Sequence, residues 1–229
     1  MLRGLPSRCQ VCGRWPAQAV CAPCLARFAT AIPRCPTCAL RSAQGVDGER
    51  PCGHCLQHPL TLQRCWAAVD YGYPWHDLVV RFKFHGQPAW AHSMGRLMRT
   101  RPDIAQALQT ADAVLPIPLS AARLAERGYN QAWELVKALR PRQALASALL
   151  KLGDEHHQTG LDRDARQRHM RGAFAVAPEH LPQVCGRHLL VVDDVMTTGA
   201  TLGAAAETLL RAGAARVDGL CFARTPAEG

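Results

Sequence analysis

Two adjacent carboxylates followed by a loop of small hydroxyl residues are the part of this sequence best suited to chemistry. Asp193 and Asp194 follow an apolar run, and the loop consists of Thr197, Thr198, Gly199, Ala200 and Thr201. Paired carboxylates can accept hydrogen bonds from two vicinal hydroxyls or hold a divalent cation. Free backbone N–H groups and the positive dipole end at a helix start bind phosphate. Together these features describe a site for a ribose 5-phosphate.

The segments on either side of these residues would position them. Residues 189–192 form a continuous apolar run, which is typical of a parallel strand covered on both faces. Residues 200–210 are rich in good helix formers. Because α/β sheets bind ligands at the carboxyl ends of their strands, the sequence predicts a strand–loop–helix unit with its anion site at the junction.

Strand and helix patterns continue through the chain after residue 64, which indicates an α/β fold. Strands are expected at residues 66–71, 113–117 and 215–222, and helices at residues 88–100, at 121–127 and from 131. Residues 75–84 are expected to form a helix or a mixed element. Residues 145–152 fit either a strand or the end of a helix, and the polar residues 153–171 suggest a hood over the phosphate site.

Three basic side chains are candidates for binding phosphates. Arg123 and Arg127 lie four residues apart, so they share one face if their segment is helical. The planar guanidinium suits a pyrophosphate, and Lys83 is assigned to the same phosphate-binding set. On spacing alone, a solvated basic helix face is an equal alternative for the two arginines. The candidates for a catalytic role are Asp193, Asp194 and Arg127.

Cysteines dominate the first part of the chain. Of the 11 cysteines, eight form the CxxC pairs Cys9/Cys12, Cys21/Cys24, Cys35/Cys38 and Cys52/Cys55. Each pair can present two thiolates to one ion, and two pairs complete a tetrahedral zinc site. We therefore expect two structural zinc sites, with sequential and interleaved pairing both open. A redox dithiol is the alternative, but four repeats are not the pattern of one catalytic dithiol.

The character of the sequence changes near residue 64. Few large apolar residues precede this point, so zinc must supply most of the folding energy there. The sequence thus predicts a small zinc-ribbon domain over residues 1–63 and a larger domain over residues 64–229. The late cysteines Cys185 and Cys221 are expected to be ordinary buried thiols.

Length and composition set further bounds. The chain has 229 residues, 48% of them hydrophobic, without an apolar run long enough to span a membrane and without a signal-peptide pattern. A cytoplasmic location is the resulting expectation. The formal net charge is +9, and eight zinc-bound thiolates with two Zn²⁺ would lower it to roughly +5. This charge favours anionic partners, either phosphorylated metabolites or nucleic acid.

The motifs together resemble known proteins. The apolar run, two acids and Thr-Gly-x-Thr resemble the 5-phosphoribosyl 1-diphosphate (PRPP) loop of type I phosphoribosyltransferases. Unlike a Walker A loop, this pattern carries no lysine after its glycine. A wider set resembles the ComF family, with its ComFC and GntX-type members: PIPLS at 116–120, RGYNQ at 127–131, QTGL at 158–161, Arg166 and MRGAF at 170–174. Residues 153–157 of this sequence differ from those usual in the family. His169 stands where the family usually has Asn.

The resemblance implies a fold and a function. The fold would be that of a type I phosphoribosyltransferase, a mostly parallel sheet with flanking helices and a small hood, preceded by a double zinc ribbon with four cysteines to each ion. The function would be binding of PRPP with Mg²⁺ in DNA uptake or in the use of imported DNA, with a helicase-type partner. Two alternatives stay open: an active phosphoribosyltransferase with an unknown acceptor, and a zinc-organised single-stranded DNA-binding module. Purine salvage is not expected, because Thr197 stands where such enzymes often carry an acidic base.

Overall fold

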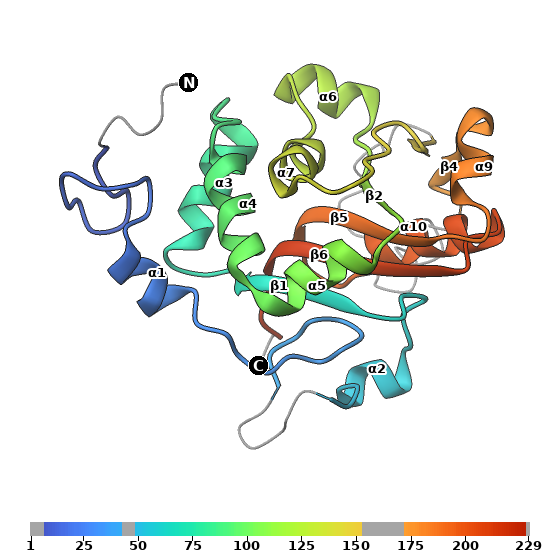
Figure 1. The fold of residues 1–229 in the computed structure, drawn as a ribbon, viewed down its shortest axis with the longest axis horizontal. Helices are drawn as coiled ribbons and strands as arrows, with labels where there is room; N and C mark the ends of the chain where they lie inside the picture. Colours follow the sequence, from blue (N-terminus) through green and yellow to red (C-terminus); the bar gives the residue numbers. More distant parts are fainter. Residues whose placement is uncertain (1–6, 43–48, 153–171, 228–229) are drawn as a thin grey trace, which may run out of the picture.

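The computed structural model of the protein describes residues 7–42, 49–152 and 172–227 (Figure 1). At its centre is a four-stranded sheet in the order β1-β6-β5-β2, and every neighbouring pair of strands is parallel. The strands are β1 (Cys65–Asp70), β2 (Ala113–Pro116), β5 (His188–Met196) and β6 (Arg216–Arg224). The predicted α/β class with a parallel central sheet is confirmed.

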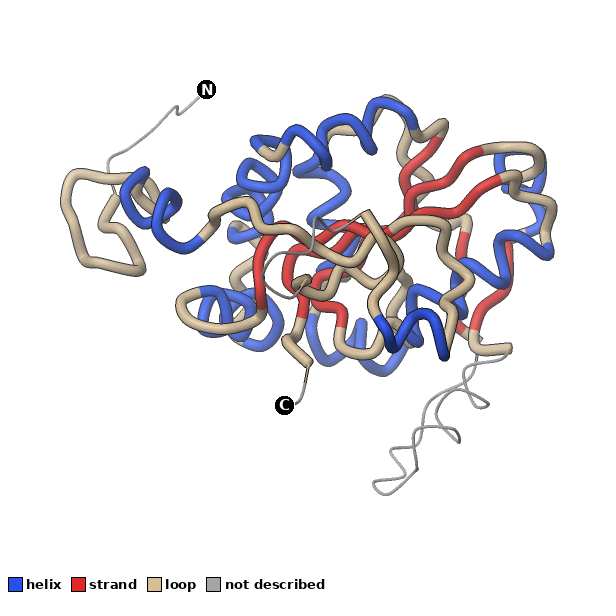
Figure 2. The backbone as a smooth tube through the Cα atoms, turned by 90° about the horizontal axis from the view of Figure 1, so that it is seen from below, coloured by secondary structure: helices blue, strands red, loops and turns tan. Residues whose placement is uncertain are grey.

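Helices cover both faces of this sheet (Figure 2). Side chains on β5 alternate between the faces, so Leu190 and Val192 share a core cluster with helices on one side, and Leu189 and Val191 face the other. The first side is covered by α3 (Trp75–Phe84), α4 (Trp90–Thr100), α5 (Pro102–Thr110) and α7 (Gln131–Leu139), and the second by α10 (Ala200–Arg211). The continuous apolar run at residues 189–192 is therefore a strand buried on both faces, as predicted.

A smaller antiparallel pair stands apart from the main sheet. It joins β3 (Leu149–Lys151) to β4 (Phe174–Val176), so the ambiguous segment 145–152 contains a strand. The short elements η1 (Pro178–His180) and α9 (Leu181–Val184) follow β4 and lead to β5. The hood predicted for residues 153–171, including the unusual residues 153–157 and His169, lies outside the described residues.

The cysteine-rich part of the chain wraps around the larger fold. Its short helices α1 (Ala22–Phe28) and α2 (Gly53–Gln57) each begin directly after a cysteine, Cys21 or Cys52. In Figure 1, α1 lies beside α3 and α4, whereas α2 lies at the opposite end of the first strand. The two halves of this region therefore pack against different parts of the sheet domain.

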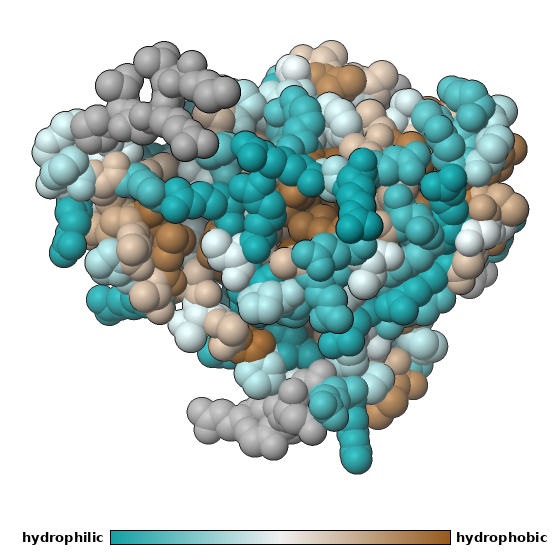
Figure 3. All heavy atoms as spheres, in the orientation of Figure 1, coloured by the Kyte–Doolittle hydropathy of each residue, from teal (hydrophilic) through white to brown (hydrophobic). Residues whose placement is uncertain are grey.

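The surface shows no band of apolar side chains on the face seen in Figure 3, where hydrophobic residues form separate spots between hydrophilic ones. Across the described ranges, no helix combines the length and the hydropathy that crossing a membrane requires.

Of the two late cysteines, Cys221 is buried in β6 as predicted. The prediction was wrong for Cys185, which is exposed because it follows the end of α9 in the turn before β5.

Candidate functional site

The acid pair lies within β5 rather than beyond its end. The strand was predicted over residues 189–192 but extends to Met196, because β6 continues the pairing alongside it. Asp194 is buried, and its backbone N–H donates a 2.8 Å hydrogen bond to Oδ1 of Asp193. Both carboxylates therefore belong to a rigid strand at the carboxyl edge of the sheet, where ligands of α/β folds bind.

The loop after β5 makes a sharp entry into α10. Gly199 is the N-cap of α10 and has a φ of +86°, a left-handed conformation that favours glycine. A Cβ at this position would lie 2.9 Å from Cδ1 of Leu60 and closer still to Cε of Met196. Inside the loop, the Ala200 N–H donates to Oγ1 of Thr198 over 3.3 Å. Glycine is thus required both by the backbone turn and by the packing behind the loop.

Lys83 reaches the acid pair from a distant part of the sequence. It lies in the last turn of α3, and its Nζ is 2.9 Å from Oδ1 of Asp194. The side chains of Lys83 and Asp194 are 21% and 7% exposed, so little water screens this ion pair. Lys83 was assigned to phosphate binding from the sequence, and the structure places it against the carboxylates.

The environment of Asp193 changes its acidity. Burial and the nearby charge of Asp194 together raise the pKa of Asp193 to about 7, and the charge of Lys83 opposes this shift. A carboxylate with this pKa is partly protonated at neutral pH and gains from a neighbouring cation or hydroxyl donor. The protonation state of Asp193 can therefore change when a ligand binds beside it.

Two arginines of α6 (Ala121–Arg127) line the same cleft as the acid pair. Arg123 and Arg127 share this helix as predicted, and Gly128 ends it with a φ of +76°. Arg127 donates to Oε1 of Gln131 over 3.1 Å, and its guanidinium lies 5.1 Å from the ring centre of Phe84. The buried Nε of Arg127 has no hydrogen-bond partner among the described residues. Arg127 lines the same cleft as the two carboxylates and Lys83, so its guanidinium is one of the cations available to an anionic ligand there.

The segment after α6 fixes that helix against the sheet. Asn130 caps α7 by accepting a hydrogen bond from Trp133 N–H, and its Nδ2 donates to the Ile117 carbonyl over 3.0 Å. The Tyr129 hydroxyl donates to the carbonyl of Phe82 in α3. The cap at Asn130 was predicted, whereas its bond to the exit of β2 was not. These contacts hold α3 and α6 around the same cleft.

Six of the predicted site residues line one cleft. They are Lys83, Arg123, Arg127, Asp193, Asp194 and Thr201. The other loop residues, Thr197, Thr198, Gly199 and Ala200, lie next to Thr201 along the chain but are not among the residues that line this cleft. The structure therefore brings together side chains from α3, α6, β5 and α10.

The cleft also contains residues that were not among the predicted site residues, although Ser120 and Phe174 belong to the motifs PIPLS and MRGAF. Lys151 and Phe174 come from β3 and β4, and the Lys151 ammonium lies 4.8 Å from the centre of the Phe174 ring. Ser120 lines the cleft as well, and its Oγ caps α6 at the Arg123 N–H. A single cation inside the apolar segment 145–152 was the available signal for Lys151. Its meaning depended on the β3–β4 pairing, which the sequence left undecided.

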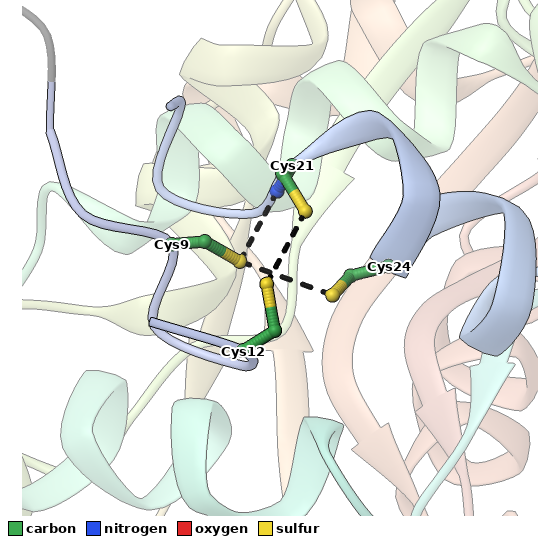
Figure 4. A group of neighbouring side chains, drawn as sticks. All are labelled: Cys9, Cys12, Cys21 and Cys24. Carbon is green, nitrogen blue, oxygen red and sulfur yellow. Dashed lines mark hydrogen bonds between the residues drawn. The ribbon is translucent and has the colours of Figure 1, made fainter. Parts of the chain in front are cut away.

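The first group of four cysteines comes together as Figure 4 shows. The Sγ atoms of Cys9, Cys12, Cys21 and Cys24 point toward one another, from the turn at residues 9–12 and from the start of α1, all within 4.8 Å. The Sγ atoms of Cys9 and Cys24 are 3.9 Å apart, and those of Cys12 and Cys21 are 3.6 Å apart. The Cys21 backbone N–H also donates to Sγ of Cys9 over 3.3 Å.

The second group repeats this arrangement with Cys35, Cys38, Cys52 and Cys55. Its Sγ separations are 3.9 Å for Cys35 and Cys55 and 3.7 Å for Cys38 and Cys52. The Cys52 N–H donates to Sγ of Cys35 over 3.2 Å. Of the two pairings left open by the sequence, the structure shows the sequential one.

Both groups have the geometry of a zinc site. Tetrahedral zinc with Zn–S bonds of about 2.3 Å separates its sulfur atoms by about 3.8 Å, close to the separations found in both groups. A hydrogen bond from Cys38 lowers the pKa of Cys35 to about 4, so one thiolate is favoured before any metal binds. Burial and the charge of Cys35 raise the pKa of Cys55 to about 12, a cost that a bound cation removes. The residues present could therefore hold two zinc ions.

Comparison with known proteins agrees with this architecture. A family model described as "Phosphoribosyl transferase domain" matches residues 129–229. The DNA utilization protein YhgH of Shigella flexneri is 33% identical over 233 residues, which cover 96% of this chain and 98% of that protein. Competence protein F of Haemophilus influenzae is 30% identical over 170 residues, covering 71% and 73% of the two chains.

A solved structure titled as that of the allosteric regulatory enzyme of purine biosynthesis aligns with 57% of this chain and 25% of its own, at 19% identity and a TM-score of 0.36. The near full-length match to the DNA utilization protein, joined to the phosphoribosyltransferase domain and the two four-cysteine groups, is stronger. The chain therefore belongs to the ComF family, with the DNA utilization protein YhgH and Competence protein F.

Proposed function

We propose that this protein binds PRPP with Mg²⁺ in the cleft at the carboxyl edge of the sheet, and that it acts in the uptake or use of DNA. One observation carries the proposal of a ligand site: the acid pair of β5, of which Asp194 is buried, lies in one cleft with cations from α3 and α6. Acids and cations in one cleft suit a ligand with both hydroxyls and phosphates. The role in DNA use rests on the names of the relatives.

Each part of the cleft has a distinct role in this proposal. Asp193 and Asp194 accept hydrogen bonds from the ribose hydroxyls or hold Mg²⁺. The backbone N–H groups of residues 197–201 surround the 5-phosphate, supported by the start of α10. Arg123, Arg127 and Lys83 neutralise the pyrophosphate. When bound, Mg²⁺ would neutralise part of the pyrophosphate charge.

The four-cysteine groups have a structural role in this proposal. All four ligand positions of each group are supplied by cysteine, which is typical of structural zinc rather than catalytic zinc. We propose zinc-ribbon and phosphoribosyltransferase-like domains over residues 1–63 and 64–229. We also propose a cytoplasmic location, where cysteine thiols stay reduced and available to zinc.

Calorimetric titration of PRPP with and without Mg²⁺ tests the binding proposal. The intact protein is expected to bind PRPP, and the double variant Asp193→Asn/Asp194→Asn is expected to lose at least tenfold in affinity. Asp77→Asn removes an exposed carboxylate from α3, the helix that carries Lys83, and serves as the control. Absence of binding by the intact protein, or equal binding by the double variant, would contradict the proposal.

Whether phosphoribosyl transfer follows binding is a second question. If the protein transfers the ribose, incubation with PRPP and an acceptor releases pyrophosphate, which a coupled assay detects. If the same cations instead hold single-stranded DNA, PRPP competes with DNA, and the DNA affinity falls steeply with salt. A helicase-type partner stays a prediction from the family resemblance.

A further inference from the structure

Arg224 is a buried arginine at the end of β6, next to the loop that follows β5. Arg224 is 7% exposed, and in the pairing of β6 with β5 it lies opposite Met196. Its Nη1 donates to the carbonyl of Met196 over 3.3 Å and to the carbonyl of Thr197. The guanidinium therefore holds the first residues of the proposed phosphate loop by their backbone.

The same guanidinium reaches the second four-cysteine group. Its Nε donates a 2.8 Å hydrogen bond to the carbonyl of Cys38, which supplies one of the four sulfur atoms. The Cys38 carbonyl belongs to a knuckle whose shape depends on the four cysteines being drawn together. The planar guanidinium of Arg224 thus joins a cysteine of the second group to the loop after β5.

Packing between the same two parts is also direct. Leu60, which follows the second group in the chain, lies behind the loop, with Cδ1 2.9 Å from the position of a Cβ on Gly199. Met196 lies closer still to that position, and its Sδ accepts a 3.6 Å contact from the Cys65 thiol. Cys35, Cys38 and Cys55 accordingly share a core cluster with α10.

The first four-cysteine group lies elsewhere. Cys9, Cys21 and Cys24 belong to the core cluster on the opposite face of the sheet, with α3 and α4. Side-chain bonds link this region to those helices, as in the 2.8 Å bond from Trp75 Nε1 to the Phe28 carbonyl and the bonds from Arg81 to Gln10 and from Arg96 to Gln18. Among the described residues, no hydrogen bond or ion pair joins the first group to the loop at residues 197–201.

We propose that Arg224 is a positioning residue that couples the second four-cysteine group, and not the first, to the phosphate loop. When metal is bound in the second group, the position of the Cys38 carbonyl is fixed. Through its hydrogen bonds, Arg224 then holds the carbonyls of Met196 and Thr197 in place. The N–H groups of the loop therefore stay directed toward the ligand. This inference rests on the proposed function where PRPP affinity is the measurement. Amide hydrogen exchange of the loop is a second measurement that does not depend on PRPP binding.

Variants of Arg224 test the bridge itself. Arg224→Met removes all its hydrogen bonds, and we expect PRPP affinity to fall at least tenfold, with at least tenfold faster amide hydrogen exchange over residues 193–203. Arg224→Lys keeps the charge but not the planar fork, so it is expected to restore only part of the affinity. Equal binding by the lysine variant and the intact protein would show that charge alone suffices, which would overturn the bridge.

Arg34→Met provides a matched control at the same junction. Arg34 precedes Cys35 of the second four-cysteine group, and its side chain is only 9% exposed, but it donates to the Ala39 carbonyl and to Asp70 of β1 instead of the loop. Its loss is expected to lower the melting temperature while leaving PRPP affinity within threefold. If Arg34→Met weakens binding as much as Arg224→Met does, the effect is a general loosening of the junction and the proposal fails.

The two metal groups are compared through one ligand from each. Cys12 and Cys52 are the more accessible cysteines of their groups, so Cys12→Ser and Cys52→Ser form a matched pair. Zinc content confirms the loss of one ion in each variant. Cys52→Ser is expected to weaken PRPP binding at least tenfold and to speed exchange over residues 193–203, whereas Cys12→Ser leaves both within threefold. Equal effects of the two variants would overturn the inference.

Failure of this inference can be told apart from failure of the proposed function. If the intact protein does not bind PRPP, the proposed function is wrong, and hydrogen exchange of the loop still decides the coupling. If the intact protein binds PRPP but neither Arg224→Met nor Cys52→Ser changes affinity or exchange, the coupling is wrong and the binding proposal stands.

Discussion

The ammonium of Lys83 lies 2.9 Å from the carboxylate of Asp194, and this ion pair joins the end of α3 to the end of β5. It brings a positive charge to a pair of acids that would otherwise repel each other on a buried strand. The same lysine faces the cleft that contains Arg123 and Arg127. Lys83 therefore serves both the stability of the acid pair and the charge of the proposed ligand site.

Replacing Lys83 is expected to weaken the binding of PRPP. Lys83→Met removes a cation from the cleft and leaves the buried Asp194 unpaired, so we expect at least a tenfold loss of affinity in calorimetry. Lys83→Arg keeps the charge and is expected to retain most of the affinity. Wild-type affinity in the methionine variant would show that the lysine does not take part in binding.

The affinity for PRPP with Mg²⁺ is expected to rise with pH between about 6 and 8. Asp193 has a pKa of about 7, and only its ionised form can hold Mg²⁺ or accept two hydroxyl hydrogen bonds. Below pH 7 each lost pH unit should weaken binding by up to about tenfold, because one proton must leave. Asp193→Asn should remove this dependence, and a pH series of titrations on both proteins would reveal it.

Folding stability should depend on pH in the opposite direction through the same residue. The folded-state pKa of Asp193 is raised from its ordinary 3.8 to about 7, so the folded state binds this proton more tightly. The resulting stability is complete below pH 4 and is lost as pH rises through 7. Asp193→Asn removes the charge whose pKa is raised, so its melting temperature should exceed that of the intact protein at pH 8 by about 2–4 °C.

At pH 5 the difference in melting temperature between Asp193→Asn and the intact protein should be smaller, because Asp193 is then mostly protonated in the folded state. Asp112→Asn, at the other end of the sheet, provides a comparison for loss of a carboxylate. An advantage of Asp193→Asn that grows toward low pH would contradict the assigned direction of the pKa shift.

Gly199→Ala should damage the loop more than an ordinary glycine replacement does. A left-handed φ costs a non-glycine residue about 1–2 kcal/mol, and the added methyl would also collide with Leu60 and Met196. Gly86 has a φ of +61° with open space around it, so Gly86→Ala tests the backbone strain alone. We expect a larger fall in melting temperature for Gly199→Ala, accompanied by weaker PRPP binding. Similar melting temperatures for the two variants would show that the packing behind the loop yields easily.

Local patterns were enough to predict the elements that carry the site. The strand within β5 follows from the run at residues 189–192, since apolar residues on both faces need cover on both sides. The cap at Asn130 and the stop at Gly128 follow from the intrinsic preferences of those residues. The short helices after Cys21 and Cys52 were missed, because their few turns carry no apolar period.

The sequence by itself determined the residue types available for chemistry: the acid pair, the hydroxyl loop, the arginines of α6 and the four CxxC pairs, all of which are contiguous motifs. Only the tertiary structure decided the sequential grouping of the cysteines, the ion pair between Lys83 and Asp194, and the bridge from Cys38 through Arg224 to the loop. Each of these joins segments distant along the chain. Their proximity depends on the order β1-β6-β5-β2 and on the packing of α3, and no local pattern encodes that order.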